Sequence, residues 1–312
     1  MAKGFFFCSS LSIIARTKEK ILTDYSLRPV LFMVGSMALF SFEDFFIKLL
    51  SKTIPASQIM IIMGLLGTTF FITAAVIAKQ PIFSRDLLDK HVVVRTLGDL
   101  FGALFFVSAI VLTPLSSASA ILQGTPLAVT AGAAIFLGET VGLRRWIAVL
   151  VGFIGIILII KPGVADFSPL SLLAVAAVIC LSARDLATRA MTDALPTITI
   201  SIYAFVALAL AGILAIPFYE AFVLPDLKET SLFLIGISSG VAAYYLLVGA
   251  TRRGEASLIA PFRYSRLIFA MLLSILILGE NPDLFTWIGA FLIVASGYFI
   301  ALRERAIKDV KR

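Results

Sequence analysis

Stretches of about 20 apolar residues, separated by short segments that hold most of the charged residues, constrain this chain more than any other feature. An α-helix rises about 1.5 Å per residue, so about 20 residues cross a hydrocarbon core of about 30 Å. A membrane-spanning strand needs only about 10 residues, so these lengths exclude a β-barrel. We therefore predict an all-α integral membrane protein with ten transmembrane helices, at residues 30–50, 56–78, 92–113, 115–137, 144–160, 169–190, 197–217, 231–250, 257–278 and 284–302.

The composition excludes a water-soluble domain. Hydrophobic residues make up 60% of the 312 residues, charged residues make up only 14%, and the mean hydropathy is +1.04. A soluble domain of this length needs far more polar surface. The two cysteines, Cys8 and Cys180, and the single histidine, His91, indicate neither a disulfide framework nor a metal cluster. We expect no metal and no cofactor.

Basic residues are distributed unevenly between the loops. If the N-terminus is cytoplasmic, 20 of the 26 Lys and Arg residues lie in cytoplasmic segments and four in outer segments, which leaves Arg263 and Arg266 inside a span. This bias agrees with the positive-inside rule and predicts that both termini are cytoplasmic. The net charge of +7 then belongs to the inner membrane face, so we expect no nucleic acid partner. The expected location is the lipid bilayer of a bacterial inner membrane.

The chain matches itself when it is shifted by 141 residues without a gap. The only two tryptophans, Trp146 and Trp287, coincide in this alignment, which is hard to attribute to chance. Further coincident positions are Ser41 with Ser182, Asp44 with Asp185, Pro55 with Pro196, and the Leu-Gly-Glu motifs at 137–139 and 278–280. The sequence therefore contains an internal repeat.

The repeat length determines the orientation of the two units, because 141 residues cover five spans. Since five is an odd number, the second unit enters the membrane upside down relative to the first. Inverted repeats are typical of secondary transporters that work by alternating access, although a duplication kept only for folding is the alternative. We predict a cytoplasmic or interfacial segment, not a cleaved leader, at 1–29, five-helix repeats at 30–161 and 169–303, and a basic cytoplasmic tail at 304–312.

Motifs in both halves resemble the EamA type of the drug/metabolite transporter superfamily. They are RTLGDLFGALFF from Arg95, TPLSSASA from Thr113, FLGET from Phe136, LRRW from Leu143, LGEN from Leu278 and WIGA from Trp287. The resemblance covers about residues 30–303 and implies transport of a small molecule. Members of the superfamily export amino acids or other metabolites, and some import nucleoside-like compounds. A basic residue that is frequent in the second span of the family is absent here.

Charged residues inside the spans are costly, so each is expected to have a partner or a function. Asp44 and Lys48 lie four residues apart in the first span, and Asp185 and Arg189 have the same spacing at equivalent repeat positions. We interpret them as two pairs, Asp44–Lys48 and Asp185–Arg189, that hold the structure together or act as gates.

Other polar residues are candidates for binding. Glu43 and Arg184 are equivalent in the repeat but opposite in charge, which suits a direction of transport or the two ends of a zwitterion. The fourth span has a polar helical face of Ser119, Gln123, Pro126 and Thr130, which either mediates helix contact or lines a cavity. Gln123 is the strongest of these candidates, because its repeat equivalent is Tyr264.

Two arginines lie deep in the ninth span, Arg263 and Arg266, and Asp99 lies at a similar depth in the third. A guanidinium in a partly dry cavity suits a carboxylate or a phosphate of the cargo, and a permanent ion pair with Asp99 is the alternative. The predicted substrate-binding residues are Glu43, Asp99, Gln123, Arg184, Arg263, Tyr264 and Arg266. Glu139 and Glu280 end the Leu-Gly-Glu motifs, and we expect each to cap the tight turn in which it lies.

The sequence lacks the parts that other functional classes require. It has no nucleophile–base group within the spans, no phosphate-binding Gly-x-x-x-x-Gly-Lys-Ser/Thr loop and no polar ring of a channel. We therefore expect a secondary transporter of a small-molecule substrate, an amino-acid-like zwitterion or an organic anion, with efflux favoured. Uptake of a nucleoside-like metabolite such as S-adenosylmethionine is the alternative. Coupling to protons through Glu43 or Asp99, facilitated diffusion and exchange all stay open, as does the choice between monomer and homodimer.

Overall fold

Helices are the regular secondary structure of the part of the chain that the computed structural model describes, which is residues 4–139, 141–162, 168–191, 195–253 and 259–311. The α-helices are α1 (Gly4–Leu50), α2 (Ala56–Ile77), α3 (Lys90–Leu112), α4 (Leu115–Leu122), α5 (Thr125–Phe136), α6 (Leu143–Ile160), α7 (Ser171–Ala190), α8 (Thr197–Ala215), α9 (Leu227–Arg253), α11 (Ser265–Leu276) and α12 (Leu284–Lys311). Short 3-10 helices are η1 (Arg85–Leu88), η2 (Ile216–Phe218) and η3 (Ala260–Tyr264).

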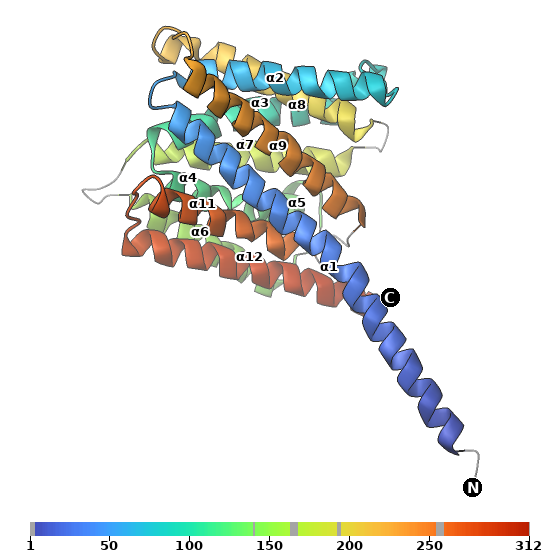
Figure 1. Cartoon of the computed structure of the whole chain (residues 1–312). Helices are drawn as coiled ribbons and strands as arrows, with labels where there is room; N and C mark the ends of the chain where they lie inside the picture. The colour runs from blue at the N-terminus through green and yellow to red at the C-terminus, as the bar shows by residue number, and fades with distance from the viewer. Residues whose placement is uncertain (1–3, 140, 163–167, 192–194, 254–258, 312) are drawn as a thin grey trace.

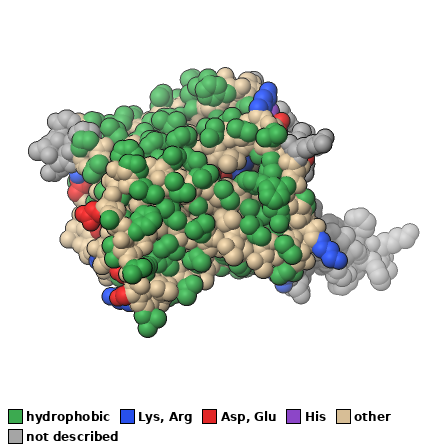
Figure 2. Space-filling model, turned by 90° about the horizontal axis from the view of Figure 1, so that it is seen from above, with side chains coloured by type: hydrophobic (Ala, Val, Ile, Leu, Met, Phe, Trp, Pro, Cys, Tyr) green, Lys and Arg blue, Asp and Glu red, His purple; other side chains and the backbone are tan. Residues whose placement is uncertain are grey.

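Within these described ranges, nine of the ten predicted spans are helical and are long and apolar enough to cross a membrane. Some of these spans consist of two consecutive helices. The ninth, predicted at 257–278, consists of η3 and α11, and residues 257 and 258 lie outside the described part. Figure 2 shows one lateral face of the bundle, covered mainly by hydrophobic side chains, with charged side chains toward its two ends. The prediction of an all-α integral membrane protein is confirmed.

Helix α1 is longer than the predicted first span. It begins at Gly4 and continues to Leu50, and Pro29 lies inside it. Figure 1 shows that the first part of this helix projects beyond the bundle. Residues 4–29 of the predicted N-terminal segment are therefore helical backbone that continues directly into the first span.

The helices pack in pairs that follow the inverted repeat. Helix α1 packs against α9, and its repeat equivalent α7 packs against α3, which is the equivalent of α9. Helix α2 packs against its own equivalent α8, and α6 packs against its own equivalent α12. A two-fold axis between the halves requires this exchange of partners. Figure 1 shows both chain ends at the same end of the bundle, which we call the proximal end, and the opposite end is the distal end.

The fourth and ninth spans are interrupted at equivalent positions. The fourth divides into α4 and α5 at Gln123 and Gly124, and Pro126 near the start of α5 has no backbone N–H to donate. The ninth changes from η3 to α11 after Tyr264, and Pro261 lies within η3. The polar face predicted for one continuous helix is therefore divided between two helices. Interrupted helices inside a membrane are tolerated where protein surrounds them or where they line a cavity.

The two Leu-Gly-Glu motifs form helix-ending turns through their glycines. Gly138 and Gly279 have φ angles of +67° and +71°, a conformation that favours glycine. The backbone N–H groups of the following residues, Glu139 and Glu280, then donate to carbonyl oxygens of the last helical turns. The two glutamates therefore close their turns as predicted, but they do so through their backbone N–H groups and the conformation of the preceding glycine.

Helices α6 and α12 lie in close contact at Gly155 and Gly289. A Cβ atom added to Gly289 would lie 2.4 Å from the carbonyl oxygen of Gly155. We expect Gly289→Val to force the helices apart and to lower the free energy of unfolding by about 1–3 kcal/mol. The thermal unfolding midpoint of the detergent-purified protein measures this effect. Gly142→Val is the control, because nothing lies within 4 Å of its added Cβ; equal midpoints for the two variants would contradict the prediction.

Candidate functional site

A cavity of about 640 Å³ lies in the centre of the bundle. Its lining extends from Ile47 and Ile59, near the distal ends of α1 and α2, to Thr188 and Ala301, near the proximal ends of α7 and α12. Its charged and polar lining residues are Glu43, Asp44, Arg95, Asp99, Gln123, Thr125, Thr130, Arg184, Asp185, Thr188, Arg189, Ser201, Tyr244, Arg263, Tyr264 and Arg266. The structure thus brings all seven predicted substrate-binding residues to one cavity of a size typical for small-molecule sites.

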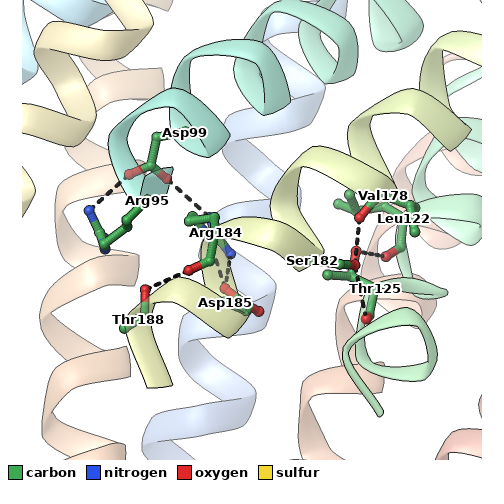
Figure 3. Close-up of polar contacts among 9 residues, drawn as sticks. All are labelled: Arg95, Asp99, Leu122, Thr125, Val178, Ser182, Arg184, Asp185 and Thr188. Atoms are coloured by element: carbon green, nitrogen blue, oxygen red, sulfur yellow. Dashed lines mark hydrogen bonds and ion pairs between the residues drawn. The ribbon is translucent and has the colours of Figure 1, made fainter. Parts of the chain in front are cut away.

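A chain of alternating charges joins α3 to α7 at the cavity wall (Figure 3). Arg95 Nη1 lies 2.9 Å from Asp99 Oδ2, and Asp99 Oδ1 lies 3.4 Å from Arg184 Nη1. Arg184 Nη2 lies 2.7 Å from Asp185 Oδ1. Gly98 allows this approach, since a Cβ atom there would lie 2.8 Å from the Cβ atom of Arg184. Asp99 is therefore held by arginines of α3 and α7, and it does not form the ion pair with Arg263 or Arg266 that was the alternative to their binding cargo.

Asp44 and Arg266 form a buried ion pair between α1 and α11. Arg266 Nη2 lies 2.9 Å and 2.7 Å from the two carboxylate oxygens of Asp44, and its Nε lies 3.2 Å from one of them. The guanidinium carbon also lies 5.3 Å and 5.6 Å from the ring centroids of Phe40 and Phe106. These hydrogen bonds and cation–π contacts hold the guanidinium in place from several sides.

The ion pairs predicted within α1 and within α7 are wrong. Asp44 pairs with Arg266 and Asp185 with Arg184, as described above, whereas Arg189 Nη1 lies 3.8 Å from Glu139 Oε1. Lys48 Nζ donates at 2.7–3.1 Å to carbonyl oxygens at the end of α3, those of Ile110, Val111 and Thr113. The spacing of four residues permits a pair, but a bidentate arginine or a set of free helix-end carbonyls provides better hydrogen-bond geometry.

Two charged residues of the cavity, Glu43 and Arg263, have no side-chain hydrogen bond or ion pair within the described part of the protein. They carry opposite charges and lie on elements that contact each other, α1 and η3. Every other charged lining residue is engaged with a protein group of opposite charge. Glu43 and Arg263 are therefore the charges that this cavity can offer to a ligand.

The interruptions of the fourth and ninth spans meet at the cavity. Gln123 Nε2 donates to the carbonyl oxygen of Arg263 at 3.2 Å. The hydroxyl of Tyr264 is buried and has no hydrogen-bond partner among the described residues, and its ring packs on Gly297. A buried hydroxyl without a partner is unfavourable, so a ligand that bonds to it would gain affinity.

Two serines support these interruptions symmetrically. Ser41 Oγ donates to the carbonyl oxygen of Arg266 at 2.8 Å. Its repeat equivalent Ser182 donates at 3.4 Å to the carbonyl oxygen of Thr125, the equivalent of Arg266 (Figure 3). The sequence repeat predicted that the two serines are equivalent, but only the structure shows which carbonyl oxygens accept their hydrogen bonds.

Polar contacts join the two halves near the distal end. The Glu280 carboxylate accepts hydrogen bonds from the backbone nitrogens of Leu115 and Ser116, at 2.7 Å and 3.0 Å, and so caps the start of α4. Gln58 binds the backbone of Val223 twice, with Nε2 at 2.6 Å from the oxygen and Oε1 at 2.9 Å from the nitrogen. Sequence reasoning missed these contacts because a backbone group as partner leaves no residue pattern.

An apolar cavity adjoins the charged one. It has a volume of about 780 Å³ and lies between α2, α8 and α9, on the side of the bundle that faces the viewer in Figure 2. Tyr244 lines both cavities, and its ring packs edge-on against Phe71 with the centroids 5.5 Å apart. Tyr244 therefore separates the charged interior from an apolar side of the bundle.

Lys161 and Asp283 form an ion pair outside the spans, between the distal ends of α6 and α12. Asp283 also accepts hydrogen bonds from Thr286, from the backbone nitrogen at 3.1 Å and from Oγ1 at 2.7 Å. Partial burial by itself would raise the pKa of Asp283, but the bonds from Lys161 and Thr286 outweigh it and lower this pKa to about 2.

This lowered pKa predicts a loss of stability in acid. The ionised carboxylate stabilises the folded state above its usual pKa of about 4, and this contribution disappears as the pH falls through about 2. Between pH 5 and pH 2, the unfolding midpoint should therefore fall less in Asp283→Asn than in the wild type. Glu220→Gln, at an exposed position, is the control and should follow the wild type. Identical curves for wild type and Asp283→Asn would contradict the prediction.

Comparison with known proteins gives consistent matches. The profile of the EamA-like transporter family matches the chain twice, at residues 27–161 and 169–302. An S-adenosylmethionine uptake transporter of Rickettsia bellii is 30% identical over 219 residues, which cover 70% of this chain and 75% of that protein. The pseudopaline exporter CntI of Pseudomonas aeruginosa is 28% identical over 271 residues, 86% of this chain and 93% of that protein.

A solved crystal structure has the same fold. It superposes with a TM-score of 0.61 and 23% sequence identity, over 89% of this chain and 98% of the solved chain. Among the described residues of the present chain, no group of three His, Cys, Asp or Glu side chains is arranged to hold a metal ion.

Proposed function

Because the chain belongs to the EamA-like transporter family, we propose that it carries a small organic metabolite across the membrane through its central cavity. The observation that best supports this proposal is a cavity with both signs of charge, lined by both repeats, which hydrogen bonds join near the distal end. Exchange of the two repeat conformations would open the same cavity to the other side. The units that exchange are the repeats at 30–161 and 169–303.

The proposed cargo is an amino-acid-like zwitterion or an organic anion. A cavity of about 640 Å³ accepts molecules between an amino acid and a nucleoside in size. Arg263 offers an unpaired guanidinium to a carboxylate or phosphate group, and Gln123 and Tyr264 add polar groups beside it. The paired charges of Asp99, Arg184 and Arg266 lie in the same wall and set its electrostatic field.

Export is the direction that we favour. The cavity extends to exposed residues at the proximal end, Thr188 and Arg189, and the positive-inside distribution assigns this end to the cytoplasm. The state described here would then load cargo from inside a bacterial cell. The similarity to an exporter supports this direction, and the similarity to an uptake transporter supports uptake as the alternative.

Counterflow in vesicles tests the proposal. Inside-out and right-side-out vesicles that contain the protein are loaded with unlabelled amino acids, organic anions or S-adenosylmethionine, and uptake of the labelled compound is followed. We expect exchange of at least one zwitterion or organic anion, with faster uptake into inside-out vesicles. Absence of exchange for every compound, with correctly inserted protein, would refute transport of these classes. Faster uptake into right-side-out vesicles would support the import alternative.

A further inference from the structure

We propose that the cargo is a zwitterion whose cationic group binds the carboxylate of Glu43 while its anionic group binds Arg263. This inference rests on the transport function proposed above, and it decides between the two cargo classes left open there. Three observations on Glu43 support it. Glu43 differs in charge from its repeat equivalent, its carboxylate packs against a glycine, and the arginines Arg266 and Arg95 are already bonded to aspartates.

Glu43 lies where the two halves differ in charge. Its repeat equivalent, Arg184, has a counter-ion on the neighbouring helix, since Asp99 of α3 lies 3.4 Å away. The position of α9 that corresponds to Asp99 is Gly240, and the position that corresponds to Arg95 is Gly236. The interface of α1 with α9 therefore lacks a counterpart of Asp99, which pairs with Arg184 across the interface of α7 with α3, and it also lacks a counterpart of Arg95. Glu43 faces a glycine where symmetry would place a charged partner.

The glycine also fixes the position of the carboxylate. A Cβ atom added to Gly240 would lie 2.5 Å from Oε1 of Glu43, so the carboxylate lies directly on the backbone of α9. The N–H of Gly240 is inside an α-helix, where it bonds to the preceding turn, and it offers no hydrogen bond to Glu43. Both residues line the central cavity. The carboxylate is thus positioned by packing at the cavity wall and keeps its acceptor sites open.

The nearby cations are already occupied. Asp44, the next residue in the chain, receives three hydrogen bonds from Arg266. On α3, Arg95 is bonded within its own helix. On η3, which packs against α1, Arg263 has no partner in the described ranges. A carboxylate in a partly dry cavity without a close cation is unfavourable, and a cationic group of the cargo relieves this cost.

Glu43 and Arg263 offer the two signs of charge that an amino acid carries. An ammonium group has three donors for a carboxylate, and a guanidinium binds a carboxylate through two parallel hydrogen bonds. An organic anion would satisfy Arg263 but leave Glu43 unpaired and repelled. The cavity should therefore prefer a zwitterion over the same molecule without its amino group by about 10- to 100-fold.

The test compares charge preferences in proteoliposomes. Counterflow of the roughly 20 common amino acids is measured first, because their sizes suit a cavity of this volume. The amino acid that is transported best is then compared with its deaminated and decarboxylated analogues. For Glu43→Gln we expect a KM for the amino acid that is about 10- to 100-fold higher, with an unchanged or lower KM for the deaminated anion. Glu220→Gln changes an exposed residue that does not line the cavity, so this variant should keep the wild-type preference.

A second variant tests the packing that positions the carboxylate. Gly240→Ala places a methyl carbon 2.5 Å from Oε1 of Glu43 and displaces the carboxylate, so it should weaken the preference for the zwitterion even though Glu43 is present. The inference is overturned by a Glu43→Gln protein with the wild-type preference, or by a wild type that transports only deaminated anions. It is also overturned if Glu43→Gln changes only the response to a pH gradient, because the carboxylate would then bind a proton. A wild type that transports none of the compounds refutes the proposed function itself.

Discussion

Replacing Arg263 with alanine is expected to abolish transport while the amount of protein in the membrane stays at the wild-type level. The guanidinium lines the cavity and has no ion pair within the described part of the chain, so its removal breaks no internal bond. Loss of a bidentate, charge-assisted contact of about 1.5–3 kcal/mol lowers affinity for an anionic group by about 10- to 100-fold. Counterflow in vesicles, normalised to protein abundance, measures this effect.

Two further substitutions show whether the loss reflects this site. Arg144→Ala removes an exposed arginine at the start of α6 and should leave transport unchanged. Arg263→Lys keeps the charge but loses the planar fork, so its transport should lie between those of the wild type and the alanine variant. Undiminished transport by Arg263→Ala would remove this residue from the binding site.

Replacing Asp44 with alanine is expected to lower the free energy of unfolding by about 3–5 kcal/mol, because it leaves the partly buried guanidinium of Arg266 without its counter-ion. Asp44 is only 3% exposed, and its carboxylate binds Arg266 through both oxygens. The measurement is the thermal unfolding midpoint of the detergent-purified protein. The change should exceed that caused by Asp283→Asn, which breaks an ion pair outside the spans.

A double substitution distinguishes the lost ion pair from a general packing defect. Arg266→Met in the Asp44→Ala background removes the unpaired charge while it keeps an apolar side chain of similar length. The double variant should therefore be more stable than Asp44→Ala alone. A double variant whose losses simply add would show that the two residues do not interact energetically.

Much of the fold could be predicted because a bilayer imposes simple lengths. The apolar stretches predicted the positions of the helices, and the 141-residue repeat predicted which helices are equivalent. The interruption at Gln123 and Gly124 was not predicted, although Pro126 is a signal for it. The long start of α1 was also missed, because residues 4–29 are not apolar enough to identify a span.

The sequence predicted which residues line the candidate site, but it did not predict which of them form ion pairs with each other. Charged residues at membrane depth avoid lipid, so Asp99, Arg184 and Arg263 could be assigned to an interior cavity from the sequence alone. Their pairing depends on side chains from distant parts of the chain. Asp44 had a permitted partner four residues away in Lys48, but it binds Arg266, which is 222 positions later.

The sequence by itself determined the class of this protein, because span length and an odd-numbered repeat are one-dimensional properties that a bilayer converts into inverted halves. Only the tertiary structure decided which of the charged residues that line the cavity form ion pairs within the described part of the chain. Arg184 and Glu43 are equivalent in the repeat, but the helix packed against Arg184 brings Asp99, and the helix packed against Glu43 brings Gly240. A charge in a membrane is neutralised by what packs beside it, and the sequence does not state which helices meet.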